Sequence, residues 1–235
     1  MKKTKLALTM ALCALLAGNT FAQDANEIVK KHNEAVGGTE KWSKVNSLRK
    51  EGTMKMQGME MPTTLTILKG KGMRQEFNMM GANNYVILTP TGGWTYLPVQ
   101  GQTKTEPIPA AELTDIADKL DFQDKIMEAS AKNYTIELLG KEDVDGKLAF
   151  KLKVTDAAKE EHTYFVDAAT WYLVKAVEKT DVMGQKVDAT VMYSNHTKLP
   201  SGIVIAMNED SGEMGSLNLT KVEENTVKDE SFFKP

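Results

Sequence analysis

The feature that most limits how this chain folds is a period of two in its hydrophobic pattern, repeated in short segments along most of the sequence. The clearest segment follows the turn dipeptide Asp145-Gly146. Its apolar side consists of Leu148, Phe150, Leu152 and Val154. Such alternation predicts strands with one buried face, because successive side chains of a strand point to opposite sides.

About eleven segments of this kind are expected to be strands. They lie within residues 47–96 and 135–222, and most are joined by short turns containing Gly, Asp or Asn. Parallel strands need crossover connections of about a dozen or more residues, so the short turns predict an antiparallel meander. Because a sheet this wide twists and curls, we expect a strongly curved sheet that forms a half-open barrel.

Two segments instead have the spacing of three and four residues that is typical of amphipathic helices, Asp24 to Val45 and Ala110 to Ala131. They are the covers available for the concave apolar face of the sheet. The predicted fold class is therefore mainly β with covering helices (α+β), a curved antiparallel sheet plugged by helices. We expect residues 23–235 to form a single domain of this kind.

Charge and cysteine content exclude several functions. The 29 Lys and Arg residues nearly balance 32 Asp and Glu residues, for a formal charge of -3. A nucleic-acid binder needs a strongly basic surface, so no nucleic-acid partner is expected. The single cysteine, Cys13, can build neither an internal disulfide nor a thiolate metal cluster.

The first residues have the order of a secretory signal. Lys2, Lys3 and Lys5 precede an apolar run, and Ala22 provides a small residue before the expected cleavage site. Residues 1–22 are therefore expected to be a cleaved signal peptide. Cys13 lies inside the apolar run rather than after it, which argues against lipidation at that residue. The mature protein is predicted to be periplasmic.

Several stretches of the sequence resemble the LolA family of periplasmic lipoprotein carriers and its relatives. The central stretch is residues 70–77, GKGMRQEF, followed by a strand over residues 85–89 and by residues 92–98, GGWTYLP. Residues 164–167 leading into residues 171–175, and the ending Phe232-Phe233-Lys234-Pro235, are also similar to the family. The opening from Asp24 to Val45 departs from the carrier and resembles uncharacterised secreted relatives.

The resemblance implies a half-open barrel with a helical lid that carries acyl chains of lipoproteins or other lipids without hydrolysing them. Inner- and outer-membrane complexes would be further partners, and a monomer is expected. On this resemblance the acyl groove is lined by Met54, Met56, Leu65, Ile67, Phe77, Met79, Ile87, Trp94, Tyr96, Leu148, Phe150 and Leu152. Trp94 and Tyr96 have a structural core role as the equal alternative.

Arg74 stands where the family has an arginine that helps to hold the lid by hydrogen bonds. The alternative interpretation is an ordinary solvated charge at the end of a strand. Arg74 and Arg49 are the two arginines of the chain.

Methionine is unusually frequent in one part of the sequence. Seven methionines fall between positions 54 and 80: Met54, Met56, Met59, Met61, Met73, Met79 and Met80. They could fill a core, line a lipid cavity with flexible side chains, or bind Cu(I) through thioethers. Met54 and Met56 fall on an apolar strand face, which favours burial over an exposed chelating loop. The alternatives to a lipid carrier are thus a Cu(I)-binding protein and an envelope interaction module with a filled core.

Motifs for catalysis are missing from the sequence. His32, His162 and His196 are far apart and form no metal-binding pattern, and no nucleophile elbow, phosphate loop or dinucleotide fingerprint occurs. We therefore expect neither an enzyme nor a cofactor, and we predict no catalytic residue and no metal ligand.

Overall fold

The computed structural model describes residues 25–113, 116–182 and 185–235. The predicted signal peptide, residues 1–22 with Cys13, lies outside the described residues. None of the helices within those ranges combines the length and the apolar character that crossing a membrane requires. The described chain divides into two compact units.

The first unit comprises residues 25–36 and 124–192 of the described chain. It begins with a helix over residues 25–35. Its other elements are α4 (Lys125–Lys132), β7 (Thr135–Val144), β8 (Lys147–Thr155), β9 (Glu161–Asp167), β10 (Leu173–Val182) and the part of β11 (Gln185–Lys198) that ends at Met192.

The second unit comprises residues 37–123 and 193–235. Its helices are α2 (Thr39–Trp42), α3 (Ile116–Lys119) and the short 3-10 helices η1 (Pro98–Gln100), η2 (Ala110–Glu112), η3 (Gly212–Met214) and η4 (Glu230–Phe233). Its strands are β1 (Ser47–Met56), β2 (Met59–Leu68), β3 (Gly72–Met79), β4 (Ala82–Thr89), β5 (Gly92–Tyr96), β6 (Glu106–Pro107), β12 (Val204–Asp210) and β13 (Ser216–Glu224), with the end of β11.

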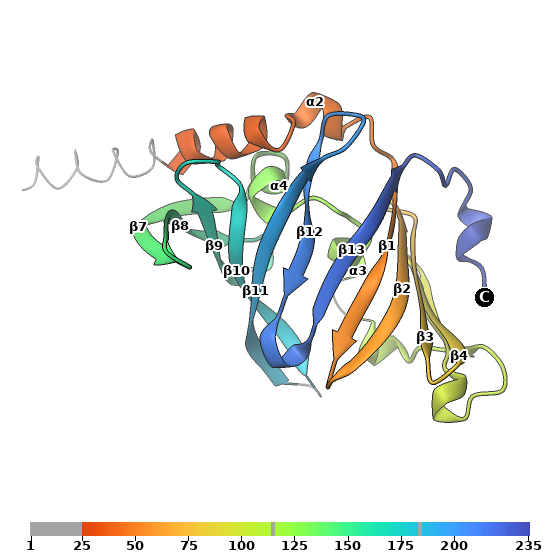
Figure 1. Cartoon of the computed structure of the whole chain (residues 1–235). Coiled ribbons are helices and arrows are strands. Elements are labelled where there is room, and N and C mark those ends of the chain that lie inside the picture. Colours follow the sequence, from red (N-terminus) through yellow and green to blue (C-terminus); the bar gives the residue numbers. More distant parts are fainter. Residues whose placement is uncertain (1–24, 114–115, 183–184) are drawn as a thin grey trace, which may run out of the picture. The chain divides into compact units, whose positions relative to one another are not determined.

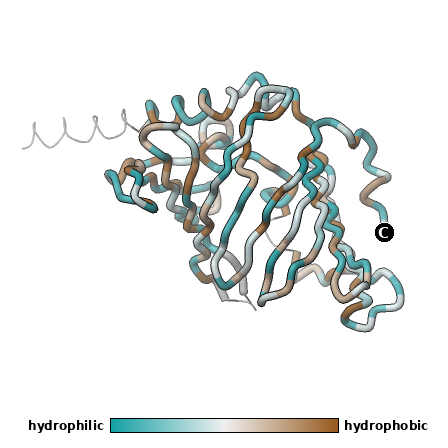
Figure 2. Tube along the Cα trace, in the orientation of Figure 1, coloured by the Kyte–Doolittle hydropathy of each residue, from teal (hydrophilic) through white to brown (hydrophobic). Residues whose placement is uncertain are grey.

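Within the described residues, thirteen strands form one antiparallel sheet (Figure 1). Their order is β6-β5-β4-β3-β2-β1-β13-β12-β11-β10-β9-β8-β7. Figure 2 shows hydrophobic and hydrophilic residues succeeding each other along the strands, as the period of two predicts. The prediction of a mainly β chain with an antiparallel sheet is confirmed.

The predicted strong curling of the sheet is not confirmed. In the described chain β6 and β7 are the two ends of the strand order, so hydrogen bonds do not close the sheet. The prediction assumed one apolar face along the whole width. On β8 and β9, however, Leu152 and Tyr164 are buried on one face, while Ala149 and Phe165 are buried on the other. A sheet that buries both faces in this part does not need to curl in order to hide one of them.

The second expected helical cover, Ala110 to Ala131, is not continuous. Its described residues form the three short helices η2, α3 and α4. The carboxylate of Asp124 accepts a hydrogen bond from the Met127 backbone N–H and so starts α4, and Asn133 ends it with a left-handed φ of 55°. The segment before α3 covers β5: a Cβ atom at Gly93 would lie within 2.9 Å of Leu88, Ile108 and Leu113 side chains.

The C-terminal segment packs onto the other face of β3–β5. Phe233 is 1% exposed and forms a buried cluster with Leu68 and Ile87. Gly72, at the start of β3, makes this packing possible, because a Cβ atom there would overlap the Phe233 ring. The end of the chain is therefore part of a core.

We expect Gly72→Ala to lower the free energy of unfolding by about 1–3 kcal/mol through this overlap. Phe233→Ala should cost about 3–5 kcal/mol, as large-to-small core substitutions do. In the Phe233→Ala background the cost of Gly72→Ala should largely disappear, because the overlapping ring is gone. Chemical denaturation of the four proteins measures this coupling.

Gly92→Ala is the matched control, because its Cβ atom would make an ordinary contact of 3.5 Å with the Trp94 ring. Strictly additive effects of Gly72→Ala and Phe233→Ala would contradict the assigned packing.

Candidate functional site

One face of β1–β3 gathers methionine and other apolar side chains. Met54 lies opposite Met61, and Met56 lies opposite Met59, in the register of β1 and β2. Directly opposed residues of antiparallel strands share a face. We call this surface the methionine face and define its members as Met54, Met56, Met59, Met61, Leu65, Phe77, Met79 and Leu217.

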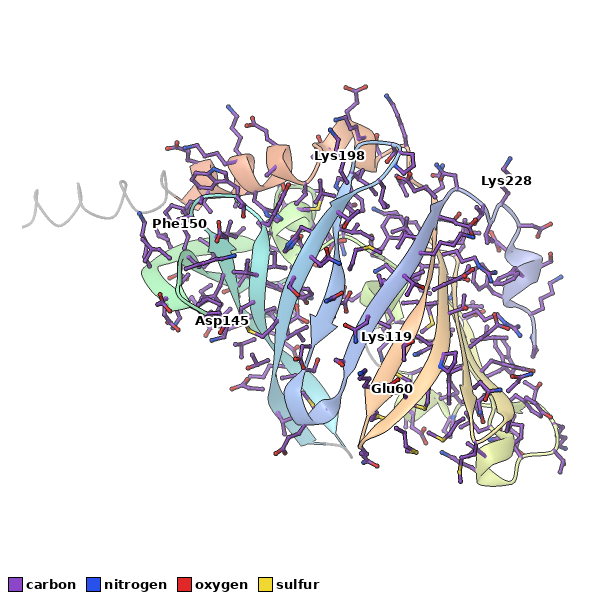
Figure 3. The ribbon with its side chains drawn as sticks, viewed as in Figure 1. Glu60, Lys119, Asp145, Phe150, Lys198 and Lys228 are labelled. Atoms are coloured by element: carbon purple, nitrogen blue, oxygen red, sulfur yellow. The ribbon has the colours of Figure 1, made fainter. Side chains whose placement is uncertain are left out.

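Most of the methionine face is neither buried nor fully exposed. Met54, Leu65 and Phe77 are half-buried, and Met59 is 38% exposed, whereas Met61 is 1% exposed. Glu60, labelled in Figure 3, marks the β1–β2 end of this surface. Half-exposed apolar side chains that adjoin one another on a sheet are a candidate binding surface for an apolar ligand.

The same face of the sheet is packed at its other end. Leu48, Ile67 and Leu88 lie across β1, β2 and β4 in one row, and they are 1%, 5% and 6% exposed. Ile67 was predicted to line the groove, but its side chain lies in the core. The candidate surface is therefore the part of the face beyond this row.

Three other predicted groove residues lie on the opposite face of the sheet. Ile87 pairs with Trp94, and Tyr85 pairs with Tyr96, so all four share the face that carries Phe233. The sequence from Tyr85 to Leu88 is apolar on both sides, and alternation could not tell which side faces a groove. The structure does not bring Ile87, Trp94 and Tyr96 together with the methionine face.

Leu148, Phe150 and Leu152 belong to β8 in the first unit. Leu148 is 52% exposed, and Leu152 is 0% exposed. The Phe150 ring stacks on Trp171, with 5.2 Å between ring centroids (Phe150 is labelled in Figure 3). The predicted groove residues are thus distributed over three surfaces. Those on β1–β3 beyond Ile67 share one face of the sheet, together with Thr63 and Gln75.

Comparisons with known proteins bear on the fold. Neither protein-family models nor curated protein sequences give a significant match to this chain. Among solved structures, a domain from Vibrio parahaemolyticus, provisionally named an outer membrane lipoprotein-sorting protein domain, aligns with a TM-score of 0.56 at 17% identity. The alignment covers 90% of this chain and 97% of that domain.

A LolA superfamily protein from Nitrosomonas europaea aligns with a TM-score of 0.56 at 11% identity, over 90% of this chain and 97% of that one. The chain has a LolA-like fold. A DUF1329 family protein from Desulfovibrio piger also aligns, with a TM-score of 0.53 at 12% identity, over 91% of this chain and 97% of that one.

Arg74 lies on the face opposite to the methionine face of this LolA-like fold, since it pairs with Thr66 and Ile87. Its Nε atom is 3.2 Å from the Glu76 carboxylate. Its guanidinium carbon is 4.4 Å from the centre of the Tyr85 ring and 5.7 Å from that of Phe232. Arg74 thus contacts the C-terminal segment, and a role in holding a helical lid stays a prediction.

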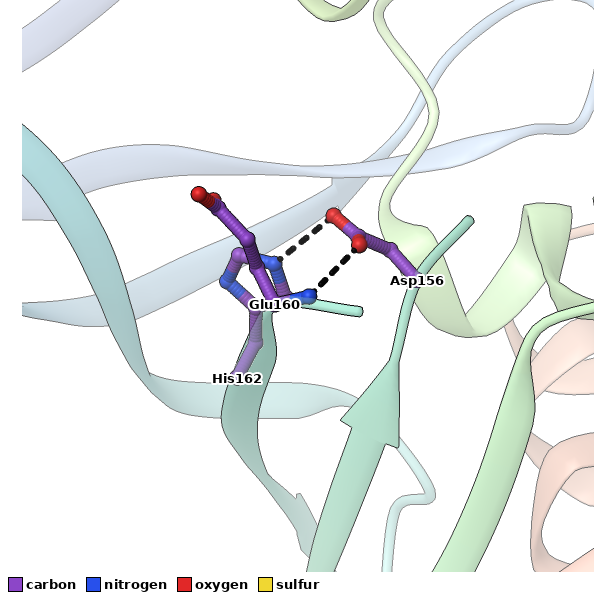
Figure 4. Close-up of side chains that lie close together, drawn as sticks. All are labelled: Asp156, Glu160 and His162. Carbon is purple, nitrogen blue, oxygen red and sulfur yellow. Dashed lines mark hydrogen bonds and ion pairs between the residues drawn. The ribbon is translucent and has the colours of Figure 1, made fainter. Parts of the chain in front are cut away.

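Asp156, Glu160 and His162 lie close together at the β8–β9 turn (Figure 4). His162 Nε2 is 3.2 Å from Asp156 Oδ2, and the Glu160 backbone N–H donates to Asp156 Oδ1 at 3.0 Å. Lys125 Nζ also lies 3.4 Å from Asp156 Oδ2. Burial raises the pKa of Asp156, but its bond to His162 and the Lys125 charge lower the pKa overall.

This cluster fits a hydrogen-bonded turn better than a metal site. A cation would compete with the Lys125 ammonium for the same carboxylate oxygen. One ligand atom from each of the three residues lies within 4.8 Å of the others, but the Asp156 oxygens already face His162, Lys125 and the Glu160 backbone N–H (Figure 4). We assign the three residues to closure of the turn.

His32 and Asp124 form a buried pair in the first unit of the LolA-like fold. His32 is 0% exposed, its Nδ1 atom lies 2.8 Å from the Trp171 carbonyl oxygen, and its Nε2 atom lies 3.1 Å from Asp124 Oδ2. Both neighbours can accept hydrogen bonds, so the site suits the protonated imidazole, in which both ring nitrogens donate. Burial alone would lower the pKa of His32, but Asp124 and the Trp171 carbonyl outweigh burial and raise it.

The pKa of Asp124 shifts in the opposite direction, downward. Burial raises the pKa of Asp124, but the His32 charge and hydrogen bond and the backbone N–H groups of Met127 and Ile126 lower it overall. The pair therefore stabilises the fold fully between about pH 4 and pH 6.5, the ordinary values of the two groups. Stabilisation is lost as pH rises through the raised pKa of His32 or falls through the lowered pKa of Asp124.

We expect His32→Gln to cost about 3–5 kcal/mol of unfolding free energy near pH 6, as breaking a buried ion pair does. The difference from the unsubstituted protein should shrink at pH values above the raised pKa of His32, where the pair is no longer charged. Urea denaturation at a series of pH values measures this difference. His196→Gln, in the other unit, is the control, and a pH-independent difference for His32→Gln would contradict the charged pair.

Proposed function

We propose that this chain binds the acyl chains of lipids or lipoproteins on the methionine face and carries them within the bacterial envelope. The observation that supports this most directly is the half-exposed apolar surface of β1–β3. The LolA-like fold supports it further, because one similar domain is named for outer membrane lipoprotein sorting.

The energetics of capture favour such a surface. Each methylene group gains about 0.8 kcal/mol on leaving water, so a chain of about fifteen methylenes gains more than 10 kcal/mol when fully buried. Thioether side chains are flexible and polarizable, so they adapt to a ligand without one fixed shape. Met54, Met56 and Met79 would supply this adaptable part of the surface.

The proposal is non-catalytic. Across β1, β2 and β3 the methionine side of the sheet carries thioethers, aliphatic groups, one aromatic ring, one hydroxyl, one amide and one ammonium. This set contains no nucleophile activated by a neighbouring base. A periplasmic monomer, exported by the predicted signal peptide, would exchange its cargo with inner- and outer-membrane complexes.

Phe77→Asp tests the surface. A charge in the middle of the methionine face should weaken uptake of a fluorescent fatty acid by at least about tenfold, or roughly 1.4 kcal/mol, because the chain would have to desolvate it. Fluorescence titration measures the affinity, and circular dichroism checks the fold.

Asn78→Asp is the matched control. Asn78 is the next residue on β3, faces the opposite side, and receives the same change of charge. If folded Phe77→Asp and Asn78→Asp took up the fatty acid equally well, the ligand would not bind on the methionine face.

A second candidate function is supported by the pairing of methionines. The register places Met54 opposite Met61 and Met56 opposite Met59, so four thioethers adjoin one another at one hairpin end. Soft thioether ligands select Cu(I). The apolar patch extends beyond them to Leu65, however, which four copper ligands would not require. We therefore rank copper binding second.

Met54→Leu together with Met61→Leu separates the two functions. Leucine keeps the surface apolar, so lipid uptake should stay within about threefold, whereas a thioether copper site would be destroyed. The exposed pair Met80→Leu and Met214→Leu is the control. The second function would be favoured if the unsubstituted protein bound Cu(I) stoichiometrically and took up no lipid, and if Met54→Leu with Met61→Leu abolished the Cu(I) binding. Binding of neither ligand would favour an interaction module with a filled core.

A further inference from the structure

Lys50 is the one charged residue that β1, β2 and β3 place on the side of the methionine face. It lies in the middle of β1, with Leu65 opposite on β2 and Val222 opposite on β13. Its side chain is half-buried. Lys50 therefore lies between the packed Leu48 end and the half-exposed Met54 end of this face.

Within the described residues, Lys50 forms no ion pair and no side-chain hydrogen bond. Two lysines on or near the same strand are paired: Lys55 Nζ lies 2.6 Å from Glu60, and Lys44 Nζ lies 2.7 Å from Glu40. Removing an ammonium group from water without a partner costs free energy. Lys50 covers its stem among apolar neighbours, and its charge, without an ion-pair partner among the described residues, is available to a ligand that supplies the counter-charge.

The carboxylates that β12 and β13 place on the same side form no ion pair with Lys50. The Glu224 carboxylate accepts hydrogen bonds from the Ser201 backbone and hydroxyl groups. Glu209 pairs with Leu217, two strands away from β1 and four residues along the sheet. Strand geometry puts it roughly 15 Å from Lys50. That is beyond the screening length of about 8 Å in physiological salt.

We infer that the methionine face takes a long-chain carboxylate, a fatty acid, with its carboxylate on Lys50. This inference rests on the proposed lipid-binding function and names its ligand class. One ammonium group, with aliphatic neighbours on both sides, suits a single negative charge. A phosphate group would be better served by several cations or by an arginine fork.

The position of Lys50 also sets the direction of the chain. The row at Leu48 and Ile67 is packed, so the chain leaves Lys50 toward Met54 and Met56. From Lys50 to Met56 the strand advances six residues, about 20 Å, which is the scale of a long acyl chain. Met54, Phe77 and Leu217 would then contact its methylene groups.

The test compares cis-parinaric acid with cis-parinaryl alcohol, two fluorescent chains that differ in the headgroup, at neutral pH. The unsubstituted protein should bind the acid about fivefold more tightly, equivalent to roughly 1 kcal/mol. Lys50→Met should remove this preference and leave the affinity for the alcohol unchanged, and Lys50→Arg should keep the preference. Lys55→Met is the control, because Lys55 is on the same strand and faces the other side.

Each outcome has a distinct meaning. Equal binding of acid and alcohol by the unsubstituted protein overturns the role of Lys50 and leaves the lipid-binding function standing. Equal weakening of both ligands by Lys50→Met also overturns it, since that would be a structural effect. Binding of neither chain overturns the proposed function, and the inference with it.

Discussion

The register of β1 against β2 is the constraint on which the candidate site depends. A slip of one residue would turn every side chain of a strand to the other face of the sheet. The register is held at the packed end, where Leu48 and Ile67 oppose each other in the core. On the other side of β1, Gly52 lets the strand approach the Asn218 backbone so closely that no Cβ atom would fit. Met54, Met56 and Lys50 face one way because these contacts allow no other pairing.

Local alternation was sufficient to predict this part of the molecule. Residues 47–56 change between apolar and polar character at almost every step, and the structure places Met54 and Met56 on the predicted common face. Lys50 was visible in the same pattern as a charge on the apolar side. The rule failed at residues 85–88, where every residue is apolar and both Ile87 and Leu88 are buried. There the face is decided by what packs on it.

What packs on each face comes from distant parts of the chain, and no local pattern contains that information. Phe233 covers the face of Ile87 and Trp94, and the segment of Ile108 and Leu113 covers the opposite face at Gly93. His32 and Asp124 are 92 residues apart in sequence and become one buried ion pair. The sequence alone favours a structural interpretation of His32, but the partner that explains its burial could not be predicted.

A half-exposed binding face suits a carrier better than an enclosed cavity would. Complete burial of a long acyl chain would hold it by more than 10 kcal/mol, and release would then be slow. Contact along one side of the chain gains about half of this free energy. That corresponds to a dissociation constant between millimolar and micromolar, before the entropy cost of ordering the chain is subtracted. One partly exposed ion pair adds about 1 kcal/mol or less and mainly orients the ligand. In this proposal the charge of Lys50 sets the direction of the ligand. The methionines around it provide apolar contact that is weak enough for the ligand to be released.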